Sequence, residues 1–270
     1  MKQQHTVSSL QRNAESAIAV GANFASSDDV VHSSRVTLDR LFSKLGIASR
    51  GVSQKWIRAG RVRLNGKLIR NPETWVAWPS DAILLDEKLI VAPERRFFLF
   101  NKPKGYITTH SDEKGRNTIF DLLPKDLGFI HAIGRLDQAT SGLILLTNDS
   151  KLSSFLADPI NKIIRIYLAS VRGKFTETKS EQAKHGVTDD GELLKCEAIK
   201  IQKSSERETH LELTLTEGKN REIRRLLKAL GHEVTRLRRI QYGPFNLGEL
   251  LPGEWKEIPM NDVEGLKSKA

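Results

Sequence analysis

The sequence lacks the hallmarks of several large protein classes. It contains one cysteine, Cys196, which excludes an internal disulfide and a cysteine-rich metal site. It has no apolar run near the ~20 residues that a membrane-spanning helix needs, and residues 1–10 lack the apolar stretch of a secretory signal. Glycine-rich phosphate loops, dinucleotide-binding fingerprints and His/Cys metal spacings are missing too. We therefore expect a cytoplasmic protein that needs no metal or other cofactor and does not bind membranes.

Acidic residues are scarce in one short segment where basic residues concentrate. The chain has a net charge of +10 and a pI near 9.7, which favours a polyanionic partner, with nucleic acid ahead of an acidic membrane surface. A solvated charged face usually mixes the two signs, because like charges repel. Between residues 35 and 70 the only acid is Asp39, among ten basic residues: Arg35, Arg40, Lys44, Arg50, Lys55, Arg58, Arg61, Arg63, Lys67 and Arg70. This segment is therefore predicted to bind nucleic acid.

Composition and periodicity divide the chain into four parts. Residues 1–34 are rich in Ser, Ala, Asn and Gln and show no sustained period, which predicts a disordered leader. Residues 35–90 predict a compact domain and residues 95–260 a larger second one. Residues 261–270 are expected to form a loose tail.

The first domain is predicted to contain two short helices followed by a small sheet. Apolar residues recur at helical spacing from 38 to 45, and Ser49 is placed to cap a second helix that ends at Gly60. Alternating residues at 61–64 then run into Asn65-Gly66, a strong signal for a type I′ hairpin. A further strand at 82–85 completes this domain.

The second domain mixes strands and helices without a regular alternation. Because doubly wound α/β folds alternate the two regularly, this order predicts an α+β fold with a mostly antiparallel mixed sheet. Gly231 is placed to stop the last helix. The predicted strands cover 97–101, 142–147, 164–171 and 210–216, and the predicted helices cover 151–157, 176–185 and 221–230.

The first domain contains four short motifs: LDRL at 38–41, GIASR at 46–50, IRAGRV at 57–62 and VRLNGK at 62–67. Together they resemble the S4-like RNA-binding domain. The resemblance implies a helix pair and a hairpin that hold the backbone of structured RNA. It places Arg50, Arg58, Arg61 and Arg63 among the RNA contacts.

Asp137 lies in a polar turn that precedes a strand apolar enough to be buried on both faces, residues 143–146. Rigid scaffolds often present functional groups on such loops. Taken alone, an aspartate beside glycine and serine more often makes a local turn hydrogen bond. The residues around Asp137 therefore leave a structural and a functional interpretation open.

A wider set of motifs spans the second domain. In chain order they are NKPKG at 101–105, GRLD at 134–137, TSGL at 140–143, LLTND at 145–149, RIY at 165–167, EGKNREIRR at 217–225, GH at 231–232 and LLPGEW at 250–255. This set resembles the pseudouridine synthases that modify ribosomal RNA, and the likeness runs from about residue 36 to 259. Three positions depart from the usual pattern: Arg165 stands where lysine is common, and Lys219 and Glu222 stand where arginine and glutamine are more usual.

This resemblance implies a role for each residue of the candidate site. Asp137 would act as a nucleophile on ribose or as a base for a sugar proton. Arg224 would lie beside Asp137 and keep its carboxylate ionised, and Tyr167 would stack on the flipped uracil. Lys102 and Arg135 would be phosphate contacts or loop anchors, and Arg221 would contact RNA.

The predicted substrate is ribosomal RNA, with the large-subunit RNA favoured over the small-subunit RNA, and the predicted state is a monomer. Two alternatives remain from the sequence. A non-catalytic ribosome-assembly factor would share the basic segment but would not need Asp137, Tyr167 and Arg224. A hydrolase with an aspartate nucleophile and a small-molecule substrate would not need the basic segment.

Overall fold

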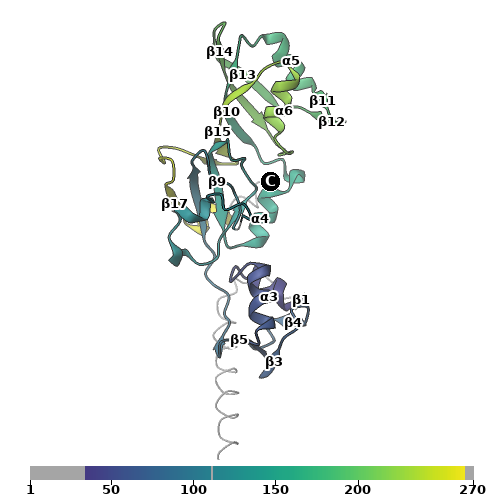
Figure 1. Ribbon diagram of the computed structural model, residues 1–270, viewed down its shortest axis with the longest axis vertical. Coiled ribbons are helices and arrows are strands. Elements are labelled where there is room, and N and C mark those ends of the chain that lie inside the picture. Colours follow the sequence, from purple (N-terminus) through teal and green to yellow (C-terminus); the bar gives the residue numbers. More distant parts are fainter. Residues whose placement is uncertain (1–33, 111, 265–270) are drawn as a thin grey trace, which may run out of the picture. The chain divides into compact units, whose positions relative to one another are not determined.

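The computed structural model describes residues 34–110 and 112–264, and the chain divides into two compact units between Glu94 and Arg95 (Figure 1). The predicted leader lies outside the described residues except for Ser34, which opens strand β1. The expected loose tail is wrong for residues 261–264. They belong to helix α7, Met260–Glu264, because Val263 is fully buried in the core of the second unit. Residues 265–270 lie outside the described part.

The first unit contains the two predicted helices, α2 (Leu38–Lys44) and α3 (Arg50–Arg58), which follow strand β1. The hydroxyl of Ser49 accepts the backbone N–H of Val52 at 3.3 Å, which confirms the predicted cap of α3. The apolar faces of the helices meet at Phe42 and Ile57, both of which are buried.

Two small sheets complete this unit, and one of them contains the expected hairpin. The φ angles of Asn65 and Gly66 are 49° and 80°, the left-handed pair that a type I′ turn requires. Strands β1 and β4, which pair with each other, and strand β6 were not predicted. The strands are β1 (Ser34–Thr37), β2 (Val62–Leu64), β3 (Lys67–Ile69), β4 (Trp75–Trp78), β5 (Ile83–Leu85) and β6 (Lys88–Leu89), with the order β3-β2-β5-β6 in the larger sheet.

Asp39 is buried at the junction of the two helices and organises it. Its carboxylate accepts hydrogen bonds from Thr37 (2.7 Å), Gln54 (2.8 Å) and the Arg50 guanidinium (3.0 and 3.1 Å). Burial alone would raise the pKa of Asp39, but these three partners and the charge on Arg50 outweigh it and lower the pKa to about 2. The single acid of the basic segment therefore joins α2 to α3.

We expect Asp39→Asn to destabilise the first unit by about 2 kcal/mol at neutral pH, since the amide loses the charge that three donors surround. A depressed carboxyl pKa contributes stability that is present above the unfolded-state pKa. In the wild type this contribution should therefore fade as the pH drops from about 4 to about 2. Urea unfolding followed by tryptophan fluorescence measures both effects. Asp86→Asn, which alters an exposed ion pair, should change stability far less. Equal effects of the two variants would contradict this role for Asp39.

The second unit is built on a nine-stranded mixed sheet that is mostly antiparallel, so the predicted α+β class is confirmed. The strand order is β13-β14-β10-β15-β9-β7-β17, with β8 beside β9 and β16 beside β15. The strands are β7 (Phe97–Lys102), β8 (His131–Ile133), β9 (Ser141–Thr147), β10 (Arg165–Arg172), β13 (Ala198–Ser204), β14 (Glu208–Leu215), β15 (Val234–Tyr242), β16 (Phe245–Asn246) and β17 (Trp255–Ile258).

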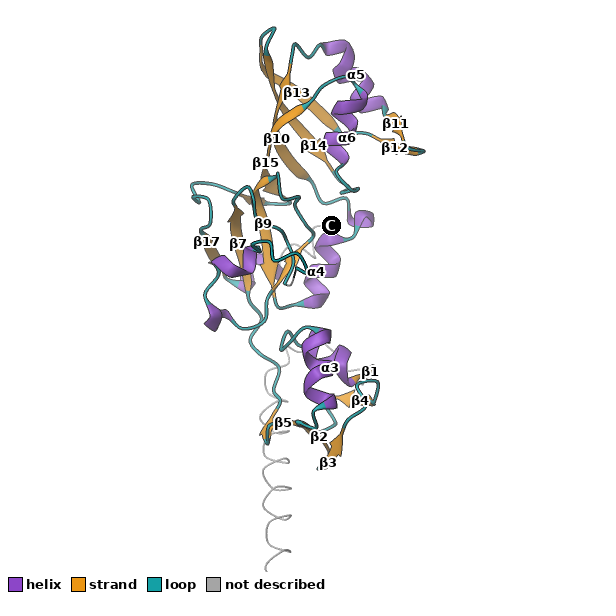
Figure 2. Cartoon of the chain, viewed as in Figure 1, coloured by secondary structure: helices purple, strands orange, loops and turns teal. Residues whose placement is uncertain are grey.

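Helices α4 (Ser150–Ala157), α5 (Glu177–His185) and α6 (Glu222–Ala229) agree with the predicted ones to within one or two residues. Helices α5 and α6 lie on the same side of the sheet at its β10–β14 end (Figure 2). A small hairpin, β11 (Val187–Asp189) and β12 (Glu192–Leu194), packs beside α6. None of the helices in the described residues has the length and hydropathy of a membrane span.

The two halves of this sheet meet at a narrow parallel contact between β9 and β15, where Ser141 and Gly142 pair with Arg238 and Arg239. Gly142 has a φ of +101°, and a Cβ atom there would lie 2.1 Å from the carbonyl oxygen of Arg239. Only glycine fits this approach. Strand β9 can therefore leave the Asp137 loop and join the sheet directly.

Candidate active site

The loop that carries Asp137 connects β8 to β9 and is fixed from both sides. The backbone N–H of Leu136 donates to the Thr108 hydroxyl (3.3 Å), which donates in turn to the Leu136 carbonyl (3.1 Å). The Gln138 carbonyl accepts the backbone N–H of Gly105 (2.8 Å), and the Gln138 side-chain amide donates to the Gly105 carbonyl (3.0 Å). Both neighbours of Asp137 are therefore held by the segment that follows β7.

Lys102 anchors the end of the same loop. Its side chain is completely buried, and its ammonium donates to the carbonyls of Thr140 (2.7 Å) and Pro103 (3.1 Å). Burial lowers the pKa of Lys102 to about 8, although the charge of Asp137 opposes this shift. Of the two roles considered for Lys102, the structure supports the loop anchor. The assignment as an RNA contact is wrong, since a fully buried ammonium cannot reach a phosphate.

Asp137 points to a different arginine from the one predicted. Its carboxylate is 31% exposed and accepts a hydrogen bond from Nη1 of Arg221 at 3.3 Å. Arg221 immediately precedes α6 and has a φ of 49°, a left-handed conformation that is uncommon for a residue with a side chain. The cation that contacts Asp137 therefore comes from the start of the helix.

Arg224 lies one turn further along α6 and binds the backbone instead. Its guanidinium donates to the carbonyls of Ala139 (3.1 Å) and Val234 (3.0 Å), so the predicted contact with the Asp137 carboxylate is absent. Burial and then the charge of Arg221 lower the pKa of Arg224, while Asp137 opposes this shift, which places their charges within electrostatic reach. Arg224 thus holds the Asp137 loop and adds positive charge near the Asp137 carboxylate.

Tyr167 lies on β10, is 9% exposed, and has a buried arginine behind it. The guanidinium of Arg239 donates to the Tyr167 hydroxyl (3.3 Å) and to the Leu143 carbonyl (2.7 Å), and lies 4.9 Å from the centre of the Tyr242 ring. Nη2 of Arg239 and Nε of Arg224 are buried and have no hydrogen-bond partner among the described residues. Both arginines line the cavity described below.

Arg165, the basic residue of the RIY motif, is a structural residue. It is 5% exposed, and it donates to the Thr216 carbonyl (2.9 Å) and to the Tyr242 hydroxyl (2.9 Å). The Tyr242 hydroxyl donates onward to the Leu156 carbonyl (2.8 Å). This buried network supports the strand that carries Tyr167.

Asp137 and Tyr167 line one cavity of about 730 Å³, within the size range of small-molecule and cofactor sites. Among the described residues no cluster of three or more His, Cys, Asp or Glu is placed to hold a metal. Arg135 is exposed at this cavity. The charged lining is mostly basic, with Arg116, Arg135, Arg165, Lys219, Arg221, Arg224 and Arg239 against Asp137, Glu217 and Glu222. Such a balance attracts a polyanion.

The arginines predicted to bind RNA in the first unit differ in their surroundings. Arg58 is exposed on α3. Arg61 pairs with Asp86, and Arg63 pairs with Glu87 at 2.8 Å, with acids that lie beyond the basic segment. Arg50 is bound to Asp39, as described above. Arg58 is therefore the arginine of this group that is exposed and makes no ion pair with another described residue.

The first unit has a helix pair rich in arginine, and the second has a cationic cavity with a carboxylate on a fixed loop. This combination is typical of enzymes that modify RNA. Residues 36–83 match the S4 domain, and residues 96–229 match the RNA pseudouridylate synthase family. An uncharacterized RNA pseudouridine synthase of Aquifex aeolicus is 34% identical over 86% of this chain and 93% of its own length.

Two further comparisons agree. Ribosomal large subunit pseudouridine synthase B of Bacillus subtilis is 33% identical over 86% of this chain and 96% of its own length. A crystal structure of a pseudouridylate synthase superposes with a TM-score of 0.61 at 28% identity, covering 86% of this chain and 99% of that one. The chain belongs to the RNA pseudouridine synthase family, and it is an isomerase that converts uridine in RNA to pseudouridine.

Proposed function

We propose that the enzyme isomerises a specific uridine of ribosomal RNA, with large-subunit RNA the favoured substrate, and that Asp137 is the reacting carboxylate. The observation that carries the second part is the position of Asp137, on a loop fixed at Leu136, Gln138 and Thr140, at a cavity that also contains Tyr167. The substrate assignment is supported by the named relative from Bacillus subtilis and by the S4 domain. We assign the activity to a cytoplasmic monomer.

The proposed reaction needs one ionised carboxylate and an extruded base. Asp137 acts on the ribose, as a nucleophile or as a base for a sugar proton, and the bond from uracil N1 to ribose C1′ breaks. The uracil rotates and its C5 bonds to C1′. On the nucleophile route this breaks the bond between Asp137 and C1′, and on the base route Asp137 returns the proton to the sugar. The C5 proton then leaves and N1 takes up a proton. Tyr167 supplies a flat face for the base, which must leave its stack to react. Atoms balance without any added group or redox partner.

Mapping pseudouridines on ribosomal RNA tests the substrate. Carbodiimide treatment followed by reverse transcription should show one or a few stops that are present with the gene and absent after its deletion. Stops on large-subunit RNA support the proposal. Stops only on small-subunit RNA or transfer RNA would overturn the preference, and an unchanged stop pattern would favour the non-catalytic alternative.

The first unit should supply electrostatic affinity for RNA. We expect the double substitution of Arg58→Glu and Arg61→Glu to weaken binding and to reduce the slope of log affinity against log salt by roughly 1 for each phosphate that is no longer neutralised. Arg50 is left out, because a glutamate there would face the buried Asp39. Filter-binding titrations at several salt concentrations measure this slope. Lys174→Glu, a charge reversal in the second unit, is the control. An unchanged slope in the double variant would remove Arg58 and Arg61 from the RNA interface.

A further inference from the structure

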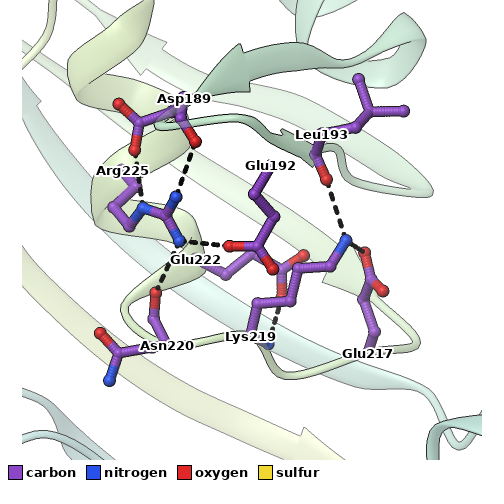
Figure 3. Close-up of polar contacts among 8 residues, drawn as sticks. All are labelled: Asp189, Glu192, Leu193, Glu217, Lys219, Asn220, Glu222 and Arg225. Carbon is purple, nitrogen blue, oxygen red and sulfur yellow. Dashed lines mark hydrogen bonds and ion pairs between the residues drawn. The ribbon is translucent and has the colours of Figure 1, made fainter.

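Two glutamates that line the cavity, Glu217 and Glu222, lie at the two ends of the loop that carries Arg221. Figure 3 shows both of them beside Lys219. Glu222 is the first residue of α6 and is 4% exposed, and its Oε2 accepts the backbone N–H of Lys219 at 3.1 Å. Glu217 lies at the other end of the loop, and its carboxylate accepts the Lys219 ammonium at 2.7 Å. The two acidic side chains therefore enclose the turn from which Arg221 projects.

The loop is also held from its outer side. The Lys219 ammonium donates to the Leu193 carbonyl on β12 at 2.9 Å. The guanidinium of Arg225 binds Asp189 (2.6 Å) and Glu192 (2.5 Å) of the β11–β12 hairpin (Figure 3). The hairpin is fixed to α6 in this way and holds the outer side of the loop. Glu217 and Glu222 hold the side that faces the cavity.

A hydrogen bond between these two carboxyl groups requires a proton. Lys219 joins the two side chains, because its backbone N–H donates to Glu222 and its ammonium donates to Glu217, and the two carboxyl groups influence each other's pKa. Oε1 of Glu222 is buried and has no hydrogen-bond partner among the described residues. Two carboxylates carry only acceptors, so one of them must be protonated to donate. A buried carboxylate oxygen without a donor would otherwise be costly.

We propose that Glu217 and Glu222 share one proton, and that this proton holds loop 217–221 in the conformation that places Arg221 on Asp137. Glu222 is then a positioning residue for the reaction, with no contact to the reacting atoms. Its protonated carboxyl does the work of a side-chain amide, since both offer one donor and one acceptor. The inference rests on the proposed role of Asp137.

The local charges favour the proton on Glu222. Burial and then the neighbouring Glu217 raise the pKa of Glu222 to about 7, and Lys219 opposes this shift. Burial raises the pKa of the nearby Cys196 thiol to about 12, so that group stays neutral. The other charged groups around the pair are Lys219 on the loop, Glu192 on β12, Lys195 and Glu197 on either side of Cys196, Lys184 on α5 and Arg225 on α6.

A falling activity at alkaline pH follows from this arrangement. Below about pH 7 the pair keeps its proton and the loop stays closed. Above that pH, both carboxylates become charged in a mostly buried contact and repel each other. Arg221 then loses its fixed position beside the Asp137 carboxylate, and turnover should decline.

Steady-state kinetics of the full-length protein test this from about pH 5.5 to about pH 8.5. We expect turnover of the wild type to fall from about pH 7, whereas Glu222→Gln, whose amide needs no proton, should lack this fall and decline only from about pH 8, where Lys102 loses its proton. Glu222→Leu should be slower by roughly tenfold at every pH, since it closes no hydrogen bond. Glu206→Gln, an exposed glutamate paired with Lys174, should reproduce the wild-type profile. A profile of Glu222→Gln that falls like the wild type, or an activity as low as that of the leucine variant, would overturn the proposal.

A titration without RNA separates this proposal from the assignment of Asp137. Carbon-13 spectra of glutamate carboxyls in the full chain should contain one signal with a midpoint near 7 that disappears in Glu222→Gln. A midpoint near 4.5, the ordinary value for glutamate, would overturn the shared proton. If Asp137→Asn kept its activity while this signal still titrated near 7, the proposed role of Asp137 would fail and the carboxyl pair would stand.

Discussion

Asp137→Asn should abolish pseudouridine formation and leave RNA binding nearly intact. The amide has the shape of the carboxylate but can act neither as a nucleophile nor as a base, so we expect turnover to fall by at least roughly 10⁴-fold. The backbone hydrogen bonds of the loop do not involve this side chain and should persist. The ion pair with Arg221, which the variant cannot form, is half exposed and contributes little to stability.

Release of tritium from RNA labelled at uracil C5 measures turnover, and filter binding measures affinity. Glu206→Gln, an exposed acid outside the cavity lining, is the matched control and should behave as the wild type. Residual turnover of Asp137→Asn within roughly tenfold of the wild type would discredit Asp137 as the reacting group.

Arg224→Met should have the second largest effect, although Arg221 makes the direct contact with Asp137. Arg224 is half buried and bridges the carbonyls of Ala139 and Val234, so its loss frees the reactive loop and removes nearby positive charge. We expect turnover to fall by roughly 10²- to 10³-fold, as when one preorganised donor is removed from an active site. Arg221→Met breaks a single 3.3 Å contact on an exposed side chain and should cost roughly tenfold.

Single-turnover kinetics with saturating enzyme compare these two variants without interference from product release. Circular dichroism of each variant checks that the fold is retained. A larger effect of Arg221→Met than of Arg224→Met would reverse the order of the two arginines and make the direct ion pair the dominant interaction.

Much of the fold could be predicted because local interactions determine it. Ser49 caps α3 by a bond three residues away, and Asn65 and Gly66 set the hairpin through their own φ angles. Gly231, with a φ of 84°, ends α6 as expected. The position of Asp137 before a buried strand was also evident, since the apolar run of β9 is continuous.

The partners of the site residues depend on contacts between distant segments, and a pattern of residue types does not specify them. Arg221 and Arg224 are three positions apart, and the left-handed backbone of Arg221 decides which of them reaches the carboxylate. A lysine is usually exposed at the surface, but Lys102 is buried and donates to the Thr140 carbonyl. Strand β15 was missed because Arg239 occupies an inward position, where the Leu143 carbonyl, the Tyr167 hydroxyl and the Tyr242 ring make a guanidinium acceptable.

The sequence did not predict the β11–β12 hairpin with its acids Asp189 and Glu192. It also did not predict the role that we propose for Glu222. The motif showed that Glu222 stands where glutamine is more usual. The proposed reason for this difference required the position of Glu217 in the structure. A useful signal for future sequences is a second acid five residues before such a glutamate, because the loop between them can bring the two together.

The approach of β9 to β15 at Gly142 joins the two halves of the sheet whose residues line the cavity. Asp137 belongs to the half that contains β8 and β9, whereas Tyr167 and Arg224 belong to the half that contains β10 and α6. Ser141 and Gly142 are the residues through which the strands of these halves are joined side by side. The relative position of Asp137 and Tyr167 therefore depends on the contact between β9 and β15, and a methyl group at Gly142 would displace the two side chains from each other.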